Sequence, residues 1–197
     1  KRLVPTRWSI TATDDSIGKF LLKKVRENKV IEDYELFFGE FLGNCYLLAL
    51  LPDVWSYELF ELYLPGSSWN PSSEIKASTD FESYSGRKTY ATSTAGGYYA
   101  SRLPIIEYLN RIKRQATVIA IRIETPSYWA ALGVWVCREA SRKTIKKGSL
   151  KFNSKEELIN CAKFVSNKKF GISIDNILKK SKILTELNQQ RKISEFF

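Results

Sequence analysis

The stretch that decides the fold is YELFFGEFLGNCYLLALLPDVWSYELFELYL, residues 34–64. It divides into three apolar and aromatic runs separated by turn residues: Tyr34–Phe41, Tyr46–Leu51 and Trp55–Leu64. The breaks are Gly43-Asn44 and Pro52-Asp53, which are typical turn dipeptides. Short runs with this punctuation predict an antiparallel meander.

Downstream of this stretch, residues 66–97 hold 12 Ser or Thr and show no usable periodicity, so a long loop is predicted there. A helix follows to about Arg114, with apolar residues on one face. Two further apolar runs, Thr117–Ile123 and Leu132–Arg138, are interpreted as strands.

Upstream, the segment Arg2–Ile10 contains a proline and β-branched residues and is predicted to be extended. Thr13-Asp14-Asp15-Ser16 then offers N-cap chemistry for a helix to about Glu27. Gly18 inside that helix costs roughly 1 kcal/mol relative to alanine, which predicts a close packing contact.

The last third favours helices. Ser154 and Glu157 form a capping box before apolar residues at helical spacing, and a second helix is expected over Ile174–Leu187. The predicted fold is α+β, a largely antiparallel sheet with flanking helices and a basic helical C-terminal region. We expect a mixed domain over 1–145, a basic helical region over 146–188 packed on it or hinged at Lys146–Ser149, and a tail over 189–197.

Composition excludes several kinds of chemistry. The 197 residues include no histidine, so serine–histidine triads and histidine-ligated metals are excluded. Three cysteines without paired spacing make neither a disulfide framework nor a four-cysteine zinc site, and no cofactor is evident. No long apolar run or signal peptide is present, so a cytoplasmic protein without membrane contact is predicted. The absence of methionine favours an excised piece of a longer protein.

The charge is uneven. The net charge is +10, and residues 138–197 alone hold 15 Lys or Arg against 6 Asp or Glu. Such a local excess predicts a polyanionic partner, nucleic acid first and a membrane surface second, although a solvated lysine-rich surface explains it too.

The final residues are Gln190-Arg191-Lys192-Ile193-Ser194-Glu195-Phe196-Phe197. They resemble, position by position, the PCNA-interacting peptide (PIP) motif. In a short helical turn Ile193, Phe196 and Phe197 share one side and form a plug for an apolar pocket, while the Gln190 amide fixes the register. The alternative is a terminal amphipathic helix that packs on its own core.

Two weaker patterns are candidate sites for phosphate and metal. Gly96 and Gly97 precede a helix and have basic residues near them in sequence, which predicts a phosphate or DNA contact; a tight turn is the alternative. The DNA-contact candidates are Arg7, Arg87, Lys88, Gly96, Gly97 and Arg102.

The adjacent carboxylates of Asp14 and Asp15 are catalytic candidates that would hold Mg²⁺ if the protein were a nuclease, and helix capping is the alternative explanation. Among the aromatic residues, Trp8 and Trp69 are the candidates for exposed stacking on bases.

Several stretches resemble the archaeal Nre family of DNA repair proteins: Arg2–Thr11 with Asp14-Asp15, Tyr34–Glu40, Thr94–Arg102 and Leu132–Trp135. The resemblance implies a factor that responds to DNA damage with PCNA in an archaeal cytoplasm, and implies no known reaction. Family members usually carry an N-terminal cysteine-rich, zinc-binding element, which this chain lacks.

Three functional hypotheses follow. The first is a repair factor docked on PCNA by its tail, with its basic region near DNA. The second is an enzyme, a nuclease or a nucleotide-processing protein, that uses the carboxylates or the Gly96-Gly97 loop. The third is an adaptor that brings another repair factor to the clamp.

Overall fold

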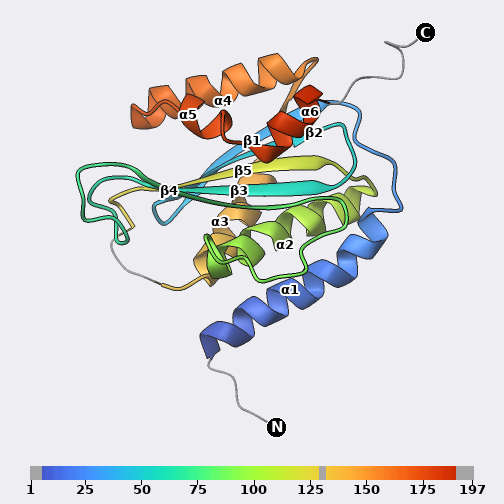
Figure 1. Ribbon diagram of the computed structural model, residues 1–197, viewed down its shortest axis with the longest axis horizontal. Coiled ribbons are helices and arrows are strands. Elements are labelled where there is room, and N and C mark those ends of the chain that lie inside the picture. Colours follow the sequence, from blue (N-terminus) through green and yellow to red (C-terminus); the bar gives the residue numbers. More distant parts are fainter. Residues whose placement is uncertain (1–5, 129–131, 190–197) are drawn as a thin grey trace.

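A computed structural model describes residues 6–128 and 132–189 as one mixed sheet between two layers of helices (Figure 1). The strands are β1 Tyr34–Phe41, β2 Asn44–Leu51, β3 Ser56–Tyr63, β4 Lys76–Glu82, β5 Thr117–Glu124 and β6 Ser149–Phe152. The helices are α1 Thr6–Val25, α2 Ala95–Ile112, α3 Trp135–Lys146, α4 Lys155–Phe170, α5 Asp175–Leu178 and α6 Lys182–Gln189.

The strand order is β4-β3-β5-β2-β1-β6, and every neighbouring pair is antiparallel except β3 and β5, which are parallel. The predicted α+β class with a mostly antiparallel sheet is therefore confirmed. The predicted meander is right for the hairpin of β1 and β2 and wrong for its third strand, because β5 lies between β2 and β3. All residues of β2 and β5 are buried, as befits the central strands of a sheet covered on both faces.

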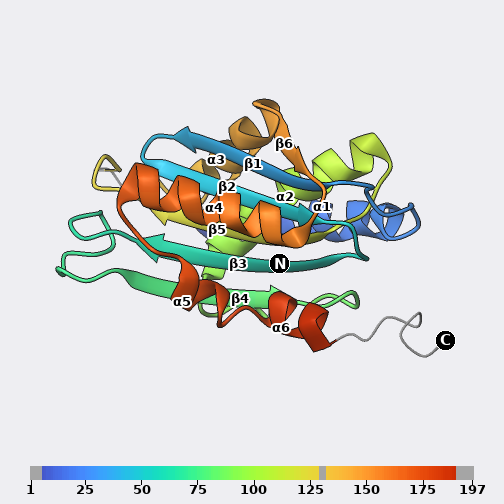
Figure 2. The same cartoon turned by 90° about the horizontal axis from the view of Figure 1, so that it is seen from above.

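Two apolar cores lie on the two faces of the sheet. Helices α1, α2 and α3 cover one face, and α4, α5 and α6 cover the other (Figure 1). Seen from above in Figure 2, α4 runs over the side of β1 and β2, and α5 and α6 lie over β3 and β4. No helix in the described part of the chain is long and apolar enough to cross a membrane.

Three local predictions are wrong. Residues from Thr6 to Ile10 are not extended, because α1 begins at Thr6. The segment Leu132–Arg138 is not a strand, since α3 begins at Trp135 and its buried Val136, Cys137 and Ala140 recur at helical spacing. The predicted long loop contains the edge strand β4. Its residues 76–79 are exposed or only partly buried, so the sequence there shows no alternation of apolar and polar residues.

Gly18 is buried and packs on α2, but not so closely that a glycine is required there. A Cβ atom at Gly18 would lie 3.5 Å from its nearest neighbour, the Arg102 guanidinium, which is ordinary contact. The close approach occurs instead at Gly39 of β1, where a Cβ atom would lie 2.7 Å from the Cα atom of Thr144 in α3.

The predicted hinge at Lys146–Ser149 coincides with the end of α3 and the start of β6, which pairs with residues 34–37 of β1. The N-cap is confirmed: the Ser154 hydroxyl accepts the backbone N–H of Glu157 at 3.2 Å at the start of α4. The Glu157 side chain accepts the backbone N–H of Asn153 at 3.1 Å, one residue before the position expected in a capping box. The division of the chain into three regions stays a prediction.

Candidate functional site

A pocket of about 230 Å³ lies where the two parallel strands β3 and β5 end. The first turns of α2 and α3 close its sides, and a loop residue, Trp69, stands at its rim. The carboxyl ends of parallel strands are a common place for binding sites, because the chain leaves the sheet there and opens a crevice. The polar and charged residues that line the pocket include Glu61, Tyr63, Thr94 and Arg122.

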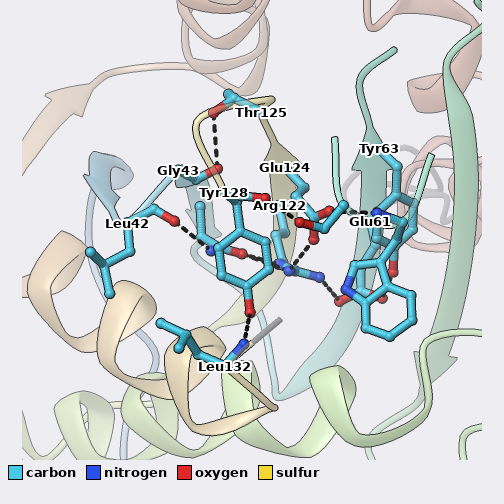
Figure 3. A network of polar contacts seen from close by, with 12 residues as sticks. Leu42, Gly43, Glu61, Tyr63, Arg122, Glu124, Thr125, Tyr128 and Leu132 are labelled. Carbon is cyan, nitrogen blue, oxygen red and sulfur yellow. Dashed lines mark hydrogen bonds and ion pairs between the residues drawn. The ribbon is translucent and has the colours of Figure 1, made fainter. Parts of the chain in front are cut away.

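Strand register builds the floor of this pocket, which consists of Glu61, Tyr63 and Arg122; Glu124 does not line the pocket but is bound to Arg122. In the parallel pair, Glu61 is the partner of Arg122 and Tyr63 is the partner of Glu124, so all four side chains fall on one face of the sheet. Arg122 donates from Nη1 to Glu61 Oε1 and from Nη2 to Glu124 Oε2, both at 2.8 Å (Figure 3). Its Nε and Nη2 also reach Asn44 Oδ1, at 2.8 and 2.6 Å.

The two carboxylates are held at their second oxygens as well. The Tyr63 hydroxyl donates to Glu61 Oε2 at 2.8 Å, and the backbone N–H of Trp69 donates to Glu124 Oε1 at 3.3 Å. Glu61, Arg122 and Glu124 are all buried. The network therefore fixes these side chains in one geometry, because a buried charge without its partners costs several kcal/mol.

Burial disfavours charge in the pocket. It raises the pKa of the Glu124 carboxyl, although Arg122 pulls that pKa down. It also raises the pKa of the Tyr63 hydroxyl and of the Cys137 thiol. Two carboxylates face one guanidinium, so the network carries a net negative charge when Glu61 and Glu124 are both ionised.

The glycine pair predicted to hold phosphate lies in this pocket, in the first turn of α2. A Cβ atom at Gly97 would lie 2.4 Å from Glu61 Oε1, and one at Gly96 would lie 2.7 Å from Val134 Cγ1. Just before the helix, Asp80 Oδ2 accepts the backbone N–H groups of Ser93 and Thr94 at 2.9 and 2.8 Å, and within the first turn the Gly97 N–H donates to the Thr94 carbonyl at 3.1 Å. The chain's own side chains thus occupy the space that the two glycines leave open.

The other basic candidates do not line the pocket. Arg102 is 2% exposed and donates to Glu82 Oε2 at 2.6 Å and to Asp15 Oδ1 at 2.7 Å. Arg87 donates to three backbone carbonyls and pairs with Asp80 at 3.2 Å, and Lys88 is exposed. These contacts favour a structural role for Arg102 and Arg87. Their part in DNA binding stays a prediction.

Asp14 and Asp15 lie in the middle of α1, so the helix-capping explanation is wrong. Each pairs with an arginine from another helix: Asp14 with Arg138 and Asp15 with Arg102. Burial raises the pKa of Asp14. Residues 6–128 and 132–189 contain no group of three or more acidic or cysteine side chains that could hold a metal ion.

Sequence reasoning missed most of the floor of the pocket. Arg122 lies in the run Thr117–Ile123, which was interpreted as an apolar strand, and Glu124 is the residue after that run. A charged residue in a strand buried on both faces is itself a signal of a polar site. The expected exposure of Trp69 is confirmed, at 61%. Gln190, Ile193, Phe196, Phe197 and the side chains of Arg7 and Trp8 lie outside the described residues.

The fold and the pocket define a mixed α+β protein with an ion-paired pocket at the ends of two parallel strands. The family model described as "Archaeal Nre, C-terminal" matches residues 82–196, and "Archaeal Nre, N-terminal" matches residues 1–70. The chain therefore belongs to the archaeal Nre family.

The chain is similar to three curated relatives. It is 36% identical to "DNA repair protein NreB" of Archaeoglobus fulgidus over 100% of this chain and 49% of the relative. It is 44% identical to "DNA repair protein NreA" of Haloferax volcanii over 72% of this chain and 34% of the relative. The NreA protein of A. fulgidus is 37% identical over 86% of this chain and 43% of the relative. The chain thus spans half or less of each relative, and no solved structure matches it.

Proposed function

We propose that this chain acts in DNA repair and is recruited to PCNA through Gln190, Ile193, Phe196 and Phe197. The observation that carries the recruitment is the position-by-position match of the last eight residues to the PIP motif. Family membership supports the repair role, because the curated relatives are named DNA repair proteins. The activity of the whole protein belongs to the same proposal.

The chain just before the tail supports this proposal. Glu58 of β3 is buried, and it accepts hydrogen bonds from Ser181 Oγ at 2.6 Å, from Lys182 N at 3.0 Å and from Ile183 N at 3.3 Å. A carboxylate at the first amides of a helix stabilises its N-terminus. The N-terminal end of α6 is therefore fixed to the sheet; the helix ends at Gln189, and the motif begins at the next residue.

The same proposal places DNA near the basic C-terminal region. Each helix layer places a lysine over an aromatic ring in the second half of β1: Lys143 Nζ of α3 lies 3.5 Å from the Phe41 ring centroid, and Lys169 Nζ of α4 lies 5.0 Å from that of Phe38. Strand β6 pairs only with residues 34–37, so this end of β1 has no strand beyond it in the described chain. Positive charges from both layers at one edge suit a phosphate backbone.

Calorimetric titration of the chain into the PCNA of its own source tests the recruitment. We expect binding by the intact chain and by Phe164→Ala, and none by the Phe196→Ala/Phe197→Ala double variant. Phe164 is a matched control, since it is an exposed phenylalanine of α4. Absence of binding by the intact chain, or equal binding by the double variant, would contradict the proposal.

The DNA contact is tested by the salt dependence of duplex binding without PCNA. We expect affinity to fall steeply with salt, and the Lys143→Glu/Lys169→Glu variant to show a shallower slope. A slope that is unchanged in this variant would place the phosphate contact elsewhere.

A further inference from the structure

We propose that the pocket at the ends of β3 and β5 binds a nucleobase that carries an amino group, either as a free nucleoside or as an unpaired base in a DNA strand. The proposal rests on the proposed repair function only for the source of the base in a strand. Four observations carry it: the size of the pocket, its charge, the donors its floor prefers, and the exposed aromatic ring at its rim.

The size fits one ring system. Pockets for drug-sized ligands have volumes of about 300–1,000 Å³. The pocket here has about 230 Å³, with β3, β5 and the first turns of α2 and α3 around it. A single planar heterocycle is a suitable occupant, whereas a base together with its sugar and phosphate needs more space than the pocket offers.

The charge excludes phosphate from the floor. The carboxylates of Glu61 and Glu124 face the single guanidinium of Arg122. Glu61 also lies against Gly97 in the first turn of α2, and Asp80 accepts the N–H group of Thr94 just before that turn, where an anion would otherwise bind. A phosphate group there would meet like charge in a site with little solvent to screen it. The proposed site therefore takes the base at its floor, as an alternative to the phosphate contact predicted for Gly96 and Gly97.

The floor prefers ligands that donate hydrogen bonds. Each carboxylate oxygen has room for about two hydrogen bonds, and the Glu61 oxygens accept one each, from Arg122 and from Tyr63. The exocyclic amino groups of adenine, cytosine and guanine supply such donors. Thymine has no amino group, so the pocket should bind it less well.

Trp69 supplies a stacking surface at the mouth of the pocket. Its side chain lines the pocket and is 61% exposed, while its backbone N–H is tied to Glu124, so the ionic network also positions the loop that carries the ring. An extruded base is held in this way elsewhere, by hydrogen bonds to its edge and by stacking on an aromatic side chain. Stacking on one ring contributes about 1–3 kcal/mol per base, which corresponds to roughly 5- to 150-fold in affinity.

The experiment measures fluorescence anisotropy with dye-labelled deoxythymidine oligonucleotides that differ only at one central position. That position carries adenine, thymine or an abasic tetrahydrofuran, so the number of phosphates stays constant. We expect the intact chain to prefer adenine over the other two by about tenfold. Trp69→Ala should weaken binding of the adenine strand by about tenfold, Trp69→Phe should weaken it less, and Phe164→Ala should leave it unchanged. The preference for adenine over thymine depends on the floor and should persist in Trp69→Ala.

Two competitors identify the chemistry and the source of the ligand. If deoxyadenosine displaces the adenine oligonucleotide, the pocket is open to free nucleosides. If deoxyadenosine does not displace it and the preference for adenine persists, the site takes a base within a strand. Equal affinity for adenine and abasic strands, an adenine strand that binds Trp69→Ala as tightly as it binds the intact chain, or displacement by inorganic phosphate would overturn the proposal. PCNA binding of Trp69→Ala is measured beside it, so that a failure of the pocket is distinguished from a failure of recruitment.

Discussion

Replacing Gly97 with alanine tests whether the glycine pair exists for packing or for a ligand. Gly97 lies in the first turn of α2, where the new Cβ atom would stand 2.4 Å from Glu61 Oε1 and 3.2 Å from its Cδ. Such contacts do not occur in stable structures, so the Glu61 carboxylate must move. Its movement stretches the ion pair with Arg122, which is 2.8 Å long and buried.

The magnitude follows from three contributions. Alanine instead of glycine in a helix gains up to about 1 kcal/mol. Overpacking a well-filled site costs about 1–3 kcal/mol. Breaking a buried ion pair completely costs about 3–5 kcal/mol, and a shift of Glu61 forfeits part of that. We expect Gly97→Ala to lower the free energy of unfolding by about 1–4 kcal/mol.

The assay is urea unfolding at pH 7, followed by circular dichroism. Gly18→Ala is the matched control: Gly18 is also in a helix, and a Cβ atom there would lie no closer than 3.5 Å to any neighbour. That variant should gain about 1 kcal/mol. A double-mutant cycle with Glu61→Ala should show that Gly97→Ala costs far less once the Glu61 carboxylate is gone.

A Gly97→Ala variant as stable as the wild type would refute this reasoning. So would a cycle in which the two substitutions simply add, because the cost of the alanine would then have a cause other than Glu61. The glycine pair would in that case be open to its earlier interpretation as a backbone contact for phosphate.

Two further predictions concern buried carboxylates. Glu58→Ala should lower the free energy of unfolding by about 1–3 kcal/mol in urea titrations, because the first donors of α6 lose their acceptor, and an unchanged midpoint would contradict the anchoring of that helix. Burial raises the pKa of Asp14, so the folded state binds the proton on this carboxyl more tightly than the unfolded state does. The resulting contribution to the free energy of unfolding is fully present below the ordinary pKa of about 4 and is lost as the pH rises through the pKa of Asp14 in the folded protein. Asp14→Asn should therefore gain stability relative to the wild type between pH 4 and pH 7, and urea midpoints that diverge in the opposite direction would show that the pairing with Arg138 outweighs burial.

Local patterns were sufficient to find most elements of the sheet. The apolar runs that became β1, β2, β3 and β5 are visible in the sequence because their residues are buried and bounded by turn residues. The helix α4 was found from the capping-box pattern at Ser154, which depends only on residues within one turn. Strand β4 was missed because an exposed edge strand has no apolar alternation.

The short segment before α3 shows why local patterns fail. Leu132–Arg138 is apolar enough for a strand, and a run of this length does not distinguish a buried strand from the start of a helix. Packing decides the matter, since Val136, Cys137 and Ala140 all turn toward buried surroundings. The opening segment was misread in the same way, because its β-branched residues favour strands only weakly against the packing of α1 on α2.

By itself, the sequence determined the α+β class, the position of the main strands, the concentration of positive charge after residue 137 and the family to which the chain belongs. These are properties of composition and of short-range pattern. Only the tertiary structure decided that β5 lies between β2 and β3, and that its register sets Arg122 beside Glu61. Strand pairing joins residues far apart in the chain, and its energy comes from burial and charge compensation across the sheet, so no local pattern specifies the pocket that results.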